Sequence, residues 1–339
     1  MKIAVIAHPR FPIAMPFAGG LEAFVASLLD SYSRFAEVYV YAHPASKVNG
    51  KLISFPFDTE AHARFPEIVE NDFLLKVMAD ITKRNIDVVH NNAISSIPPL
   101  WAAKYNIPLL TTLHTPPYSK LKAAAELASY APNVHYNAVS YSVAEQWRPF
   151  LNDDIEVIYN GIDLSRWSSK KTNPEYVFSF GRILPSKGFD LAIQCANQLG
   201  IDFKFAGPVF DQHYFNKSIA PLLNDRVTYL GHLTHDSINS YLLRAQAAIF
   251  AVRWDEPFGL STVEAMATGT PVAAFRRGAF PEVVAESGGR LASGNNVLSL
   301  TEALSKTLSC HQDEVLDQAA QFPLEKMCSQ YQQKLIGML

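Results

Sequence analysis

The stretch IDVVHNNAISSIPPLWAAKYNIPLLTTLH, residues 86–114, contains a complete strand–helix–strand unit. Its two ends, 86–91 and 108–114, are short runs centred on aliphatic residues, as is typical of buried strands. The segment between them, 98–106, is predicted to form a helix. Apolar strands that alternate with helices are characteristic of a parallel sheet that helices cover on both faces. This unit therefore predicts an α/β fold.

The same alternation continues in both directions from this unit. In the first half, further strands are predicted at 2–7, 37–42, 136–140 and 155–160, and further helices at 20–33, 71–84, 120–129 and 142–150. In the second half, strands are predicted at 176–181, 202–207, 227–231, 247–252 and 271–275, and helices at 188–200, 235–246, 281–287, 297–309 and 324–339. The halves repeat an architecture without repeating a sequence. We therefore expect two doubly wound, Rossmann-like parallel-sheet domains that face a cleft.

A polar segment, GIDLSRWSSKKTNPE at 161–175, interrupts the alternation. Segments that combine Gly, Pro and polar residues in this way commonly connect domains, so we interpret this one as a linker. We expect the first domain to end near residue 165 and the second to cover residues 166–321.

The overall composition restricts the class of protein. The chain has 339 residues, of which 48% are hydrophobic and 18% are charged. These values suit a globular protein with two domains of about 150 residues each. The formal net charge of −3 provides no strong attraction to nucleic acid or to an anionic membrane. We therefore predict no nucleic-acid partner, and the composition does not support peripheral membrane contact.

The cysteines and the apolar runs indicate the cellular compartment of the protein. The three cysteines are scattered and include no Cys-x-x-Cys pair, so neither a disulfide framework nor a cysteine zinc site is expected. A reduced setting fits this pattern best. The N-terminal apolar run stops at His8, too early for a signal peptide, and no run approaches about 18 apolar residues. We therefore expect a cytoplasmic protein without a transmembrane helix.

The loops that follow the strands are the places to search for a site, because open parallel sheets bind ligands at the carboxyl ends of their strands. The first such loop ends in Gly19-Gly20, directly before a predicted helix. Glycines at a helix start allow the backbone to approach an anion. The alternative is a simple glycine turn. The spacing does not match G-x-G-x-x-G, so the dinucleotide-binding fingerprint is absent.

A second loop, GRILPSKG at 181–188, carries two cations before a predicted helix. Arg182 offers a planar fork to phosphate oxygens, and Lys187 offers a compact charge. Together with the helix N-terminus they form a candidate diphosphate site. The alternative is that both are solvated loop residues.

A third stretch, EPFGLSTVEAMATGTPV at 256–272, holds two glutamates eight positions apart. Pro257 and Gly259 argue against one continuous helix, so we expect the helix to begin at Ser261. Glu256 would then lie on a loop and Glu264 in the first helical turn. The sequence Ser261 to Glu264 also matches a capping box, which would need no ligand.

The same stretch suggests a ligand. The amides of Gly259, Leu260 and Ser261 would point out of the helix N-terminus toward an anion. Carboxylates beside a phosphate site would repel the phosphate, so Glu256 and Glu264 suit hydroxyl donors such as sugar or ribose groups.

One histidine ends a predicted strand. His114, in TTLHTPP, can donate a hydrogen bond or carry charge near pH 7. A structural histidine with its hydrogen bonds satisfied is the alternative.

Several of these motifs together resemble one family. GR-x4-KG, the E-x7-E spacing in 256–272, YNGID at 159–163 and FPEVV at 280–284 are similar to retaining glycosyltransferase family 4, whose members have the GT-B fold. Gly19-Gly20 followed by Glu22 also resembles that family's N-terminal loop. The resemblance covers nearly the whole chain and is most specific in the second half.

The resemblance implies an acceptor-side domain of residues 1–165 plus a returning C-terminal helix, 322–339, and a donor-binding domain of residues 166–321. It implies that Arg182 and Lys187 hold the donor diphosphate and that Glu264 binds the ribose. The catalytic residues that it implies are Glu256, His114, Arg182 and Lys187. The donor-binding residues that it implies are Gly19, Gly20, Arg182, Lys187, His232, Leu233, Glu256, Phe258, Gly259, Leu260, Ser261 and Glu264.

The function that follows from the resemblance is transfer of a sugar, with retention of configuration, from a nucleotide-diphosphate sugar to an unidentified acceptor. That acceptor is a glycan, a lipid-linked molecule or a small molecule. The sequence contains no D-x-D motif, so we expect no metal and no other cofactor. One departure concerns VRWDEPFG: many members have a Pro-Ser pair before the first glutamate, whereas this chain has Arg253 and Trp254 in that region. These two side chains could reshape the sugar pocket.

Other functions stay open at this point. A non-catalytic nucleotide-sugar binding subunit and a nucleotide-sugar epimerase are the main alternatives. A phosphorylase lacks support because no pyridoxal lysine motif is found, and an NAD-dependent oxidoreductase lacks the glycine fingerprint. Acceptor contacts are expected in loops 9–19, 56–70 and 114–123. Lys120 and Lys122 in the last loop could meet a phosphate, a lipid head group or a glycan, or could be a solvated helix end.

Overall fold

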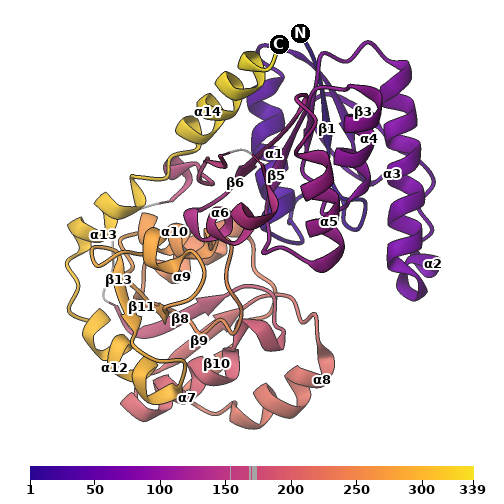
Figure 1. Cartoon of the computed structure of the whole chain (residues 1–339). Helices are drawn as coiled ribbons and strands as arrows, with labels where there is room; N and C mark the ends of the chain where they lie inside the picture. The colour runs from indigo at the N-terminus through magenta and orange to yellow at the C-terminus, as the bar shows by residue number, and fades with distance from the viewer. Residues whose placement is uncertain (153, 168, 170–173) are drawn as a thin grey trace. The chain divides into compact units, whose positions relative to one another are not determined.

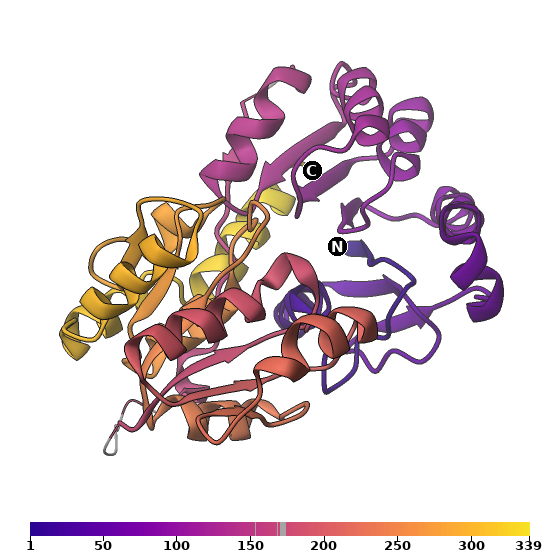
Figure 2. The ribbon, with the colours of Figure 1, turned by 90° about the horizontal axis from the view of Figure 1, so that it is seen from below.

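The computed structural model describes residues 1–152, 154–167, 169 and 174–339. The chain divides into two compact units, one formed by Met1–Asn160 with Lys326–Leu339 and the other by Gly161–Glu325. Each unit is built around one sheet whose paired strands are all parallel, with helices on its faces (Figures 1 and 2). The predicted α/β class, with two doubly wound Rossmann-like sheets, is therefore confirmed.

The first unit contains a seven-stranded sheet in the order β3-β2-β1-β4-β5-β6-β7. Its strands are β1 (Lys2–Ile6), β2 (Glu37–Tyr41), β3 (Lys51–Ile53), β4 (Val88–Asn91), β5 (Leu109–Leu113), β6 (Val134–Ala138) and β7 (Glu156–Val157). Its helices are α1 (Gly20–Tyr32), α2 (Thr59–Arg64), α3 (Pro66–Lys83), α4 (Ile97–Tyr105), α5 (Ser119–Ala128), α6 (Tyr141–Trp147) and most of α14 (Leu324–Gly337). The central strands β4 and β5 are buried along their whole length, as their aliphatic residues predicted.

The second unit contains a six-stranded sheet in the order β10-β9-β8-β11-β12-β13. Its strands are β8 (Tyr176–Phe180), β9 (Phe203–Ala206), β10 (Val227–Tyr229), β11 (Ala245–Phe250), β12 (Val272–Phe275) and β13 (Gly289–Ala292). Its α-helices are α7 (Phe189–Leu199), α8 (Gln212–Tyr214), α9 (His235–Leu242), α10 (Leu260–Ala267), α11 (Phe280–Val283), α12 (Val297–Thr307) and α13 (Gln312–Ala319). The strand order reverses between β8 and β11. A doubly wound sheet binds its ligand at the carboxyl ends of the strands at such a reversal.

Side chains that alternate along the strands build the two faces of the second sheet. Phe203 and Phe205 are fully buried in one core cluster, which includes Phe189 of α7 and Leu300 of α12. Phe178 lies outside that cluster and stacks on Tyr241 of α9, with ring centres 5.7 Å apart. Alternate residues of a strand point to opposite faces, so both faces of this sheet bury aromatic rings.

Some short elements were not predicted. The strands β3 and β13 and the helices α2 and α13 are absent from the predicted set. Strand β13 reads Gly-Arg-Leu-Ala, which is too short for a periodic pattern, and pairing with β12 is what makes it a strand. Elements of this length depend on their tertiary neighbours more than on local preference.

The predicted linker is also more structured than expected. In its first part, the amide of Ile162 donates to the carbonyl oxygen of Phe322, and the carbonyl of Ile162 accepts from the amide of Leu324. A short 3-10 helix follows at Leu164–Arg166. Residues 168 and 170–173 of the predicted linker lie outside the described residues. Among the residues that the structure does describe, no helix is both long enough and apolar enough to span a bilayer.

A buried polar chain fastens α14 to the first unit. Thr112 donates to Oδ1 of Asn137 (2.8 Å), and Nδ2 of Asn137 donates to the hydroxyl of Tyr331 on α14 (2.9 Å). His90 contacts the Thr112 hydroxyl through Nε2 (2.8 Å) and the Tyr32 hydroxyl through Nδ1 (2.9 Å). Burial, with a smaller contribution from His114, lowers the pKa of His90 to about 3, so His90 is neutral. Because Thr112 donates its hydroxyl proton to Asn137, Nε2 of His90 is the donor to the Thr112 hydroxyl.

We predict that Tyr331→Phe destabilises the protein. The change removes the acceptor of the Asn137 amide and leaves a buried donor unsatisfied, which costs about 1–3 kcal/mol. Urea unfolding of the variant and the wild type measures this cost. Tyr130→Phe is the matched control, because the Tyr130 side chain is 71% exposed, and its effect should stay within about 0.5 kcal/mol. Equal stability of Tyr331→Phe and wild type would contradict the role given to the hydroxyl.

Candidate functional site

The carboxyl edge of the second sheet collects most of the predicted site residues. Arg182 follows β8, His232 follows β10, and Glu256 follows β11. The carboxyl ends of parallel strands meet at one edge, so these loops are neighbours within the second unit. The predicted residues that this edge brings together are Arg182, Lys187, His232, Leu233, Glu256, Phe258, Gly259, Leu260, Ser261 and Glu264.

Gly188 fixes the turn that carries Lys187. Lys187 ends a 3-10 helix, Pro185–Lys187, and Gly188 follows with φ of +66°. A Cβ atom on Gly188 would lie 1.9 Å from the carbonyl oxygen of Ala251, just beyond the end of β11. Only glycine allows this close approach of two backbones, which brings Lys187 to the β11 loop.

Lys187 and Glu256 form an ion pair. Nζ of Lys187 lies 2.7 Å from Oε2 of Glu256, and the two side chains keep only 21% and 13% of their surface exposed. The indole Nε1 of Trp254 donates to the same oxygen (2.8 Å). Nζ of Lys187 also lies 5.4 Å from the centre of the Trp254 ring, within cation–π range. The sequence suggested separate ligands for Lys187 and Glu256 and did not reveal this pairing.

Arg253 supports the Lys187 turn. Its guanidinium donates to the carbonyl oxygen of Pro185 (2.8 Å) and to Oδ2 of Asp190 (2.6 Å). Tyr214 donates to the other oxygen of Asp190 (2.6 Å). Burial alone would raise the pKa of Asp190, but the hydrogen bonds from Arg253 and Tyr214 outweigh it and lower that pKa. Sequence reasoning missed Asp190 and Tyr214, and nothing in the local pattern marks them.

Arg182 lies at the same edge on the β8 loop. Its guanidinium carbon is 5.3 Å from the centre of the Phe210 ring, on the loop after β9. Within the described part of the chain, Arg182 has no carboxylate partner. Its positive charge is therefore available to an anion, and the aromatic ring restricts where the guanidinium lies.

The helix α10 begins one residue earlier than predicted. It covers Leu260–Ala267, and its N-cap is Gly259 with φ of +89°. A Cβ atom on Gly259 would lie 2.5 Å from Cε1 of Phe280, so a larger residue does not fit without movement. No side chain caps this helix, and the first amides are open to a ligand.

The capping-box interpretation of Glu264 is wrong. Gly259 occupies the N-cap, so Glu264 falls beyond the first turn, where it cannot reach back to the N-cap amide. Its Oε1 lies 3.8 Å from Nε2 of His235, the first residue of α9, which is too long for a hydrogen bond. Burial raises the pKa of Glu264 to about 7. Burial, with a smaller contribution from Arg166, lowers the pKa of His235. Burial therefore favours the neutral form of both side chains.

The loop after β10 carries His232 and Leu233, the two residues expected near the base of the nucleotide. Gly231 has φ of +76°, and its carbonyl oxygen accepts from the amide of Gly207 on the neighbouring β9 loop (2.8 Å). His232 is exposed and Leu233 is half-buried. The structure therefore keeps this loop close to the sheet edge through its backbone.

The remaining predicted residues belong to the first unit. Neutral His114, directly after β5, donates from Nε2 to Oδ1 of Asn92 (2.9 Å) and packs edge-on against Phe24. Burial, with a smaller contribution from His8, lowers the pKa of His114 to about 3, so it does not carry charge near pH 7. Gly19 is the N-cap of α1 with an extended φ of −169°, a conformation open to any residue.

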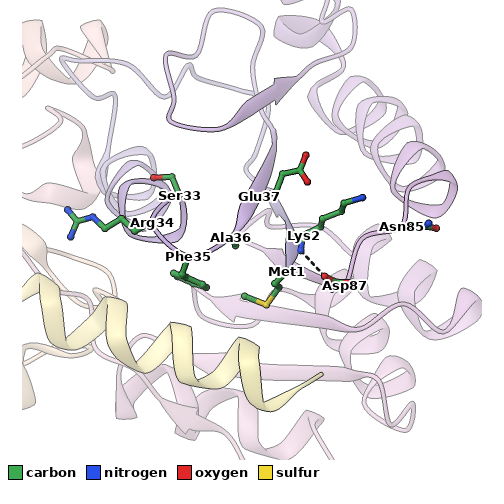
Figure 3. Close-up of a pocket in the computed structure, with 9 residues that line it drawn as sticks. All are labelled: Met1, Lys2, Ser33, Arg34, Phe35, Ala36, Glu37, Asn85 and Asp87. Carbon is green, nitrogen blue, oxygen red and sulfur yellow. Dashed lines mark hydrogen bonds between the residues drawn. The ribbon is translucent and has the colours of Figure 1, made fainter.

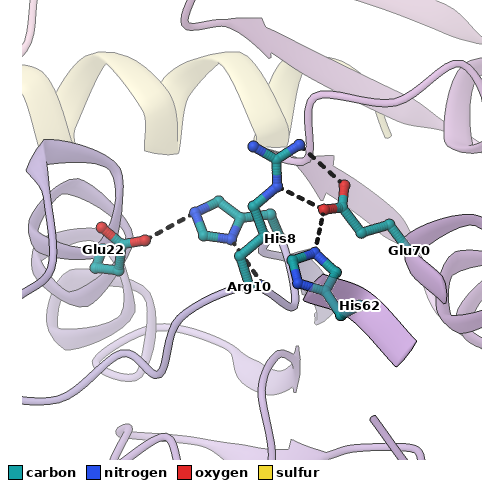
Figure 4. A network of polar contacts seen from close by, with 5 residues as sticks. All are labelled: His8, Arg10, Glu22, His62 and Glu70. Atoms are coloured by element: carbon teal, nitrogen blue, oxygen red, sulfur yellow. Dashed lines mark hydrogen bonds and ion pairs between the residues drawn. The ribbon is translucent and has the colours of Figure 1, made fainter. Parts of the chain in front are cut away.

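Two of the predicted acceptor loops are tied together in the first unit. Arg10 donates to both carboxylate oxygens of Glu70 (2.6 and 3.1 Å), and Nε2 of His62 lies 2.8 Å from the same carboxylate (Figure 4). His8 contacts Glu22 at 2.7 Å beside them (Figure 4). Burial alone would raise the pKa of Glu70, but the hydrogen bonds from Arg10 and His62 outweigh it and lower that pKa.

The third predicted acceptor loop is joined to the second. Lys120, at the start of α5, lies 2.6 Å from Glu67 at the start of α3. Both side chains are mostly exposed, so this pair adds little stability. Lys122 lies over the ring of Phe150, 4.7 Å from its centre.

Two pockets lie away from these residues. One, of about 540 Å³, lies in the first unit beside Lys2, Arg34 and Asp87, where the amide of Lys2 donates to Asp87 (2.7 Å; Figure 3). The other, of about 420 Å³, lies in the second unit beside Arg276 and Arg290. None of the predicted site residues lines either pocket. Within the described residues, no group of three or more His, Cys, Asp and Glu could hold a metal ion.

Comparison with known families gives two matches. Residues 18–166 match the family described as Glycosyltransferase Family 4, and residues 162–330 match Glycosyl transferases group 1. Together these matches leave only the two ends of the chain uncovered.

Similar proteins point the same way. The D-inositol 3-phosphate glycosyltransferase of Mycolicibacterium smegmatis is 27% identical over 91% of this chain and 83% of its own length. The glycogen synthase of Mycobacterium tuberculosis is 33% identical, but over only 42% of this chain and 36% of its own length.

Solved structures share the fold. Sucrose-phosphate synthase from Thermosynechococcus elongatus has a TM-score of 0.81 at 17% identity and covers 99% of this chain and 98% of its own. Anabaena Alr3699/HepE in complex with UDP and glucose has a TM-score of 0.77 at 22% identity and covers 99% of this chain and 100% of its own.

We predict that the stability of the wild type falls, relative to Glu264→Gln, as pH rises. The pKa of Glu264 in the folded protein, about 7, lies above its ordinary value of 4.5, so folding favours the protonated form. This contribution is complete below the unfolded pKa and is lost as pH rises through the folded pKa. Urea unfolding between about pH 5 and about pH 8 should show the glutamine variant gaining about 1–3 kcal/mol on the wild type. A difference that stays constant with pH would contradict the assignment.

Proposed function

Because the chain is built from two glycosyltransferase domains of the GT-B superfamily, we propose that it transfers a sugar from a nucleotide-diphosphate sugar to a hydroxyl-bearing acceptor. We further propose retention of the anomeric configuration and no requirement for a metal. One observation carries the proposal: the carboxyl edge of the second sheet joins two cations, two carboxylates and an uncapped helix N-terminus. The acceptor stays open.

The cationic groups suit a leaving diphosphate. Glycosyl transfer passes through an oxocarbenium-like state while negative charge grows on the departing phosphate. Arg182 and Lys187 supply positive charge, and the amides of Gly259, Leu260 and Ser261 supply donors at the start of α10. This set of groups can stabilise the growing charge without a metal ion.

The carboxylates suit the hydroxyl groups of the donor. Glu264 would accept from the ribose, since burial beside His235 leaves its carboxyl without a hydrogen-bond partner in the described structure. Glu256 would accept from a hydroxyl of the donor sugar. The backbone around His232 and Leu233 would contact the base, and the amide of Phe258 would contact the sugar or the phosphate.

The first unit has a smaller part in the proposal. His114 is neutral and has already used its Nε2 proton, so its Nδ1 would accept from a sugar hydroxyl. Gly19 and Gly20 would allow close approach of a donor oxygen to the start of α1. The names of similar proteins support a nucleotide-linked donor, since the Anabaena protein was solved with UDP and glucose.

A ligand screen tests the proposal. The folded protein is heated with UDP, GDP, ADP or dTDP, and with their common sugar conjugates, in the absence of metal. A ligand at about 100 times its Kd should stabilise the protein by about 2.7 kcal/mol. The stabilising sugar nucleotide is then incubated with a panel of glycans, lipid-linked acceptors and small polyols, and transfer is followed by mass spectrometry.

We expect stabilisation by one nucleotide and transfer to at least one acceptor. The absence of any shift in a folded sample would contradict the donor site. Binding without transfer would favour a partner subunit, and conversion of the donor without an acceptor would favour an epimerase.

We predict that Arg182→Ala lowers kcat/KM by about 100- to 1000-fold, by analogy with the loss of one oxyanion donor. The reason is the lost stabilisation of charge on the leaving diphosphate. Steady-state kinetics with the identified donor measures the effect. Arg226→Ala is the matched control, because the Arg226 side chain is 61% exposed and donates to the Gly200 carbonyl oxygen away from the site. Near-normal turnover by Arg182→Ala would remove Arg182 from the mechanism.

A further inference from the structure

The Glu256 carboxylate receives two donors on a single oxygen. Nζ of Lys187 and Nε1 of Trp254 both bind Oε2, at 2.7 and 2.8 Å. Among the described residues, nothing hydrogen-bonds to Oε1 of Glu256. One oxygen is therefore held from two sides while the other stays available.

The backbones that carry these side chains are anchored independently of the ion pair. Gly188 packs against Ala251, and Arg253 bonds to the Pro185 carbonyl oxygen on the same turn. The backbone of Glu256 is also held, because its carbonyl oxygen accepts from the amide of Ala279 (2.8 Å). The lysine ammonium, on a flexible four-carbon stem, can thus change partner while the turn stays in place.

Two anions compete for the Lys187 ammonium. The proposed function, on which this inference rests, gives Lys187 the donor diphosphate, whereas the structure shows it on Glu256. If Lys187 leaves for the diphosphate, Glu256 is a largely buried carboxylate that has lost its cation. Such a group is costly unless other donors replace the lysine.

We propose that Trp254 is a positioning residue that keeps Glu256 in place when Lys187 moves to the donor diphosphate. Before the donor binds, Glu256 holds the ammonium over the indole ring. When it binds, the ammonium transfers to the diphosphate and a hydroxyl of the donor sugar takes its place on the carboxylate. The indole N–H stays on Oε2 throughout and fixes the direction of Oε1.

The exchange makes the two halves of the donor cooperate. A nucleoside diphosphate alone takes Lys187 away from Glu256 and returns no donor to the carboxylate. The complete sugar nucleotide returns a hydroxyl. Trp254 therefore matters in both complexes. It is the one described donor left on Glu256 when the nucleoside diphosphate binds alone, and it orients Oε1 for the sugar hydroxyl when the complete donor binds.

The test is a double-mutant cycle with Trp254→Phe, Glu256→Gln and the double variant. Phenylalanine keeps an aromatic ring and removes the indole N–H. We expect Trp254→Phe to lower kcat by about 10- to 100-fold, the loss of one hydrogen bond to a charged group. The inhibition constant of the free nucleoside diphosphate should rise as well, because Glu256 then loses both of its donors, and the double variant should be no slower than Glu256→Gln.

Trp101→Phe is the matched control. Trp101 lies in the first unit, and its indole likewise donates to one oxygen, the Thr82 hydroxyl, at 2.9 Å. Its substitution should leave kcat and the inhibition constant unchanged.

A second measurement does not require Trp254→Phe to fold. Titration with the nucleoside diphosphate should change tryptophan emission as the ammonium leaves the Trp254 ring. Lys187→Met, which lacks the ammonium, should not show this change.

The possible outcomes are distinct. Effects of Trp254→Phe and Glu256→Gln that multiply, an unchanged kcat, an unchanged inhibition constant of the nucleoside diphosphate, or an emission change that persists in Lys187→Met would each overturn the inference. If the wild type itself transfers no sugar to any acceptor, the proposed function fails instead.

Discussion

The close contact between Gly188 and the carbonyl of Ala251 determines the geometry of the candidate site. A side chain at residue 188 would leave 1.9 Å between a carbon and that oxygen, so the turn and the end of β11 lie together only because residue 188 is a glycine. From this contact follow the ion pair between Lys187 and Glu256 and the support that Arg253 gives the turn. One backbone approach thus connects the loops after β8 and β11 within the second unit.

Different partners give the two glutamates of the site different properties. Glu256 is paired with a lysine and an indole, so its charge is compensated inside the protein. Glu264 has only a distant histidine, and burial raises its pKa to about 7. Two carboxyl groups eight residues apart therefore lie in different electrostatic surroundings. In the polar chain from Tyr32 to Tyr331, by contrast with Glu264, each buried polar side chain has a hydrogen-bond partner.

The long elements could be predicted from sequence, and the short ones could not. Runs centred on aliphatic residues, such as 109–113, are buried on both faces and can be recognised from the sequence. Strand β13 contains Arg290 and only four residues, and it forms because β12 offers a free edge. The start of α10 was misplaced by one residue because a positive φ at Gly259 is not visible in a propensity pattern. That single residue decides whether Glu264 can cap the helix.

The sequence alone was sufficient for the α/β class, for the two parallel sheets, and for placing Arg182, Lys187, Glu256 and Glu264 on loops or helices that follow strands. These features depend on local periodicity and on the rule that parallel strands end at one edge. Only the tertiary structure decided that Lys187 pairs with Glu256, that Trp254 shares that carboxylate, and that Glu264 faces His235. The Lys187–Glu256 and Glu264–His235 contacts join residues far apart in the chain, and all three contacts depend on side-chain positions and burial that are set by how the elements pack together.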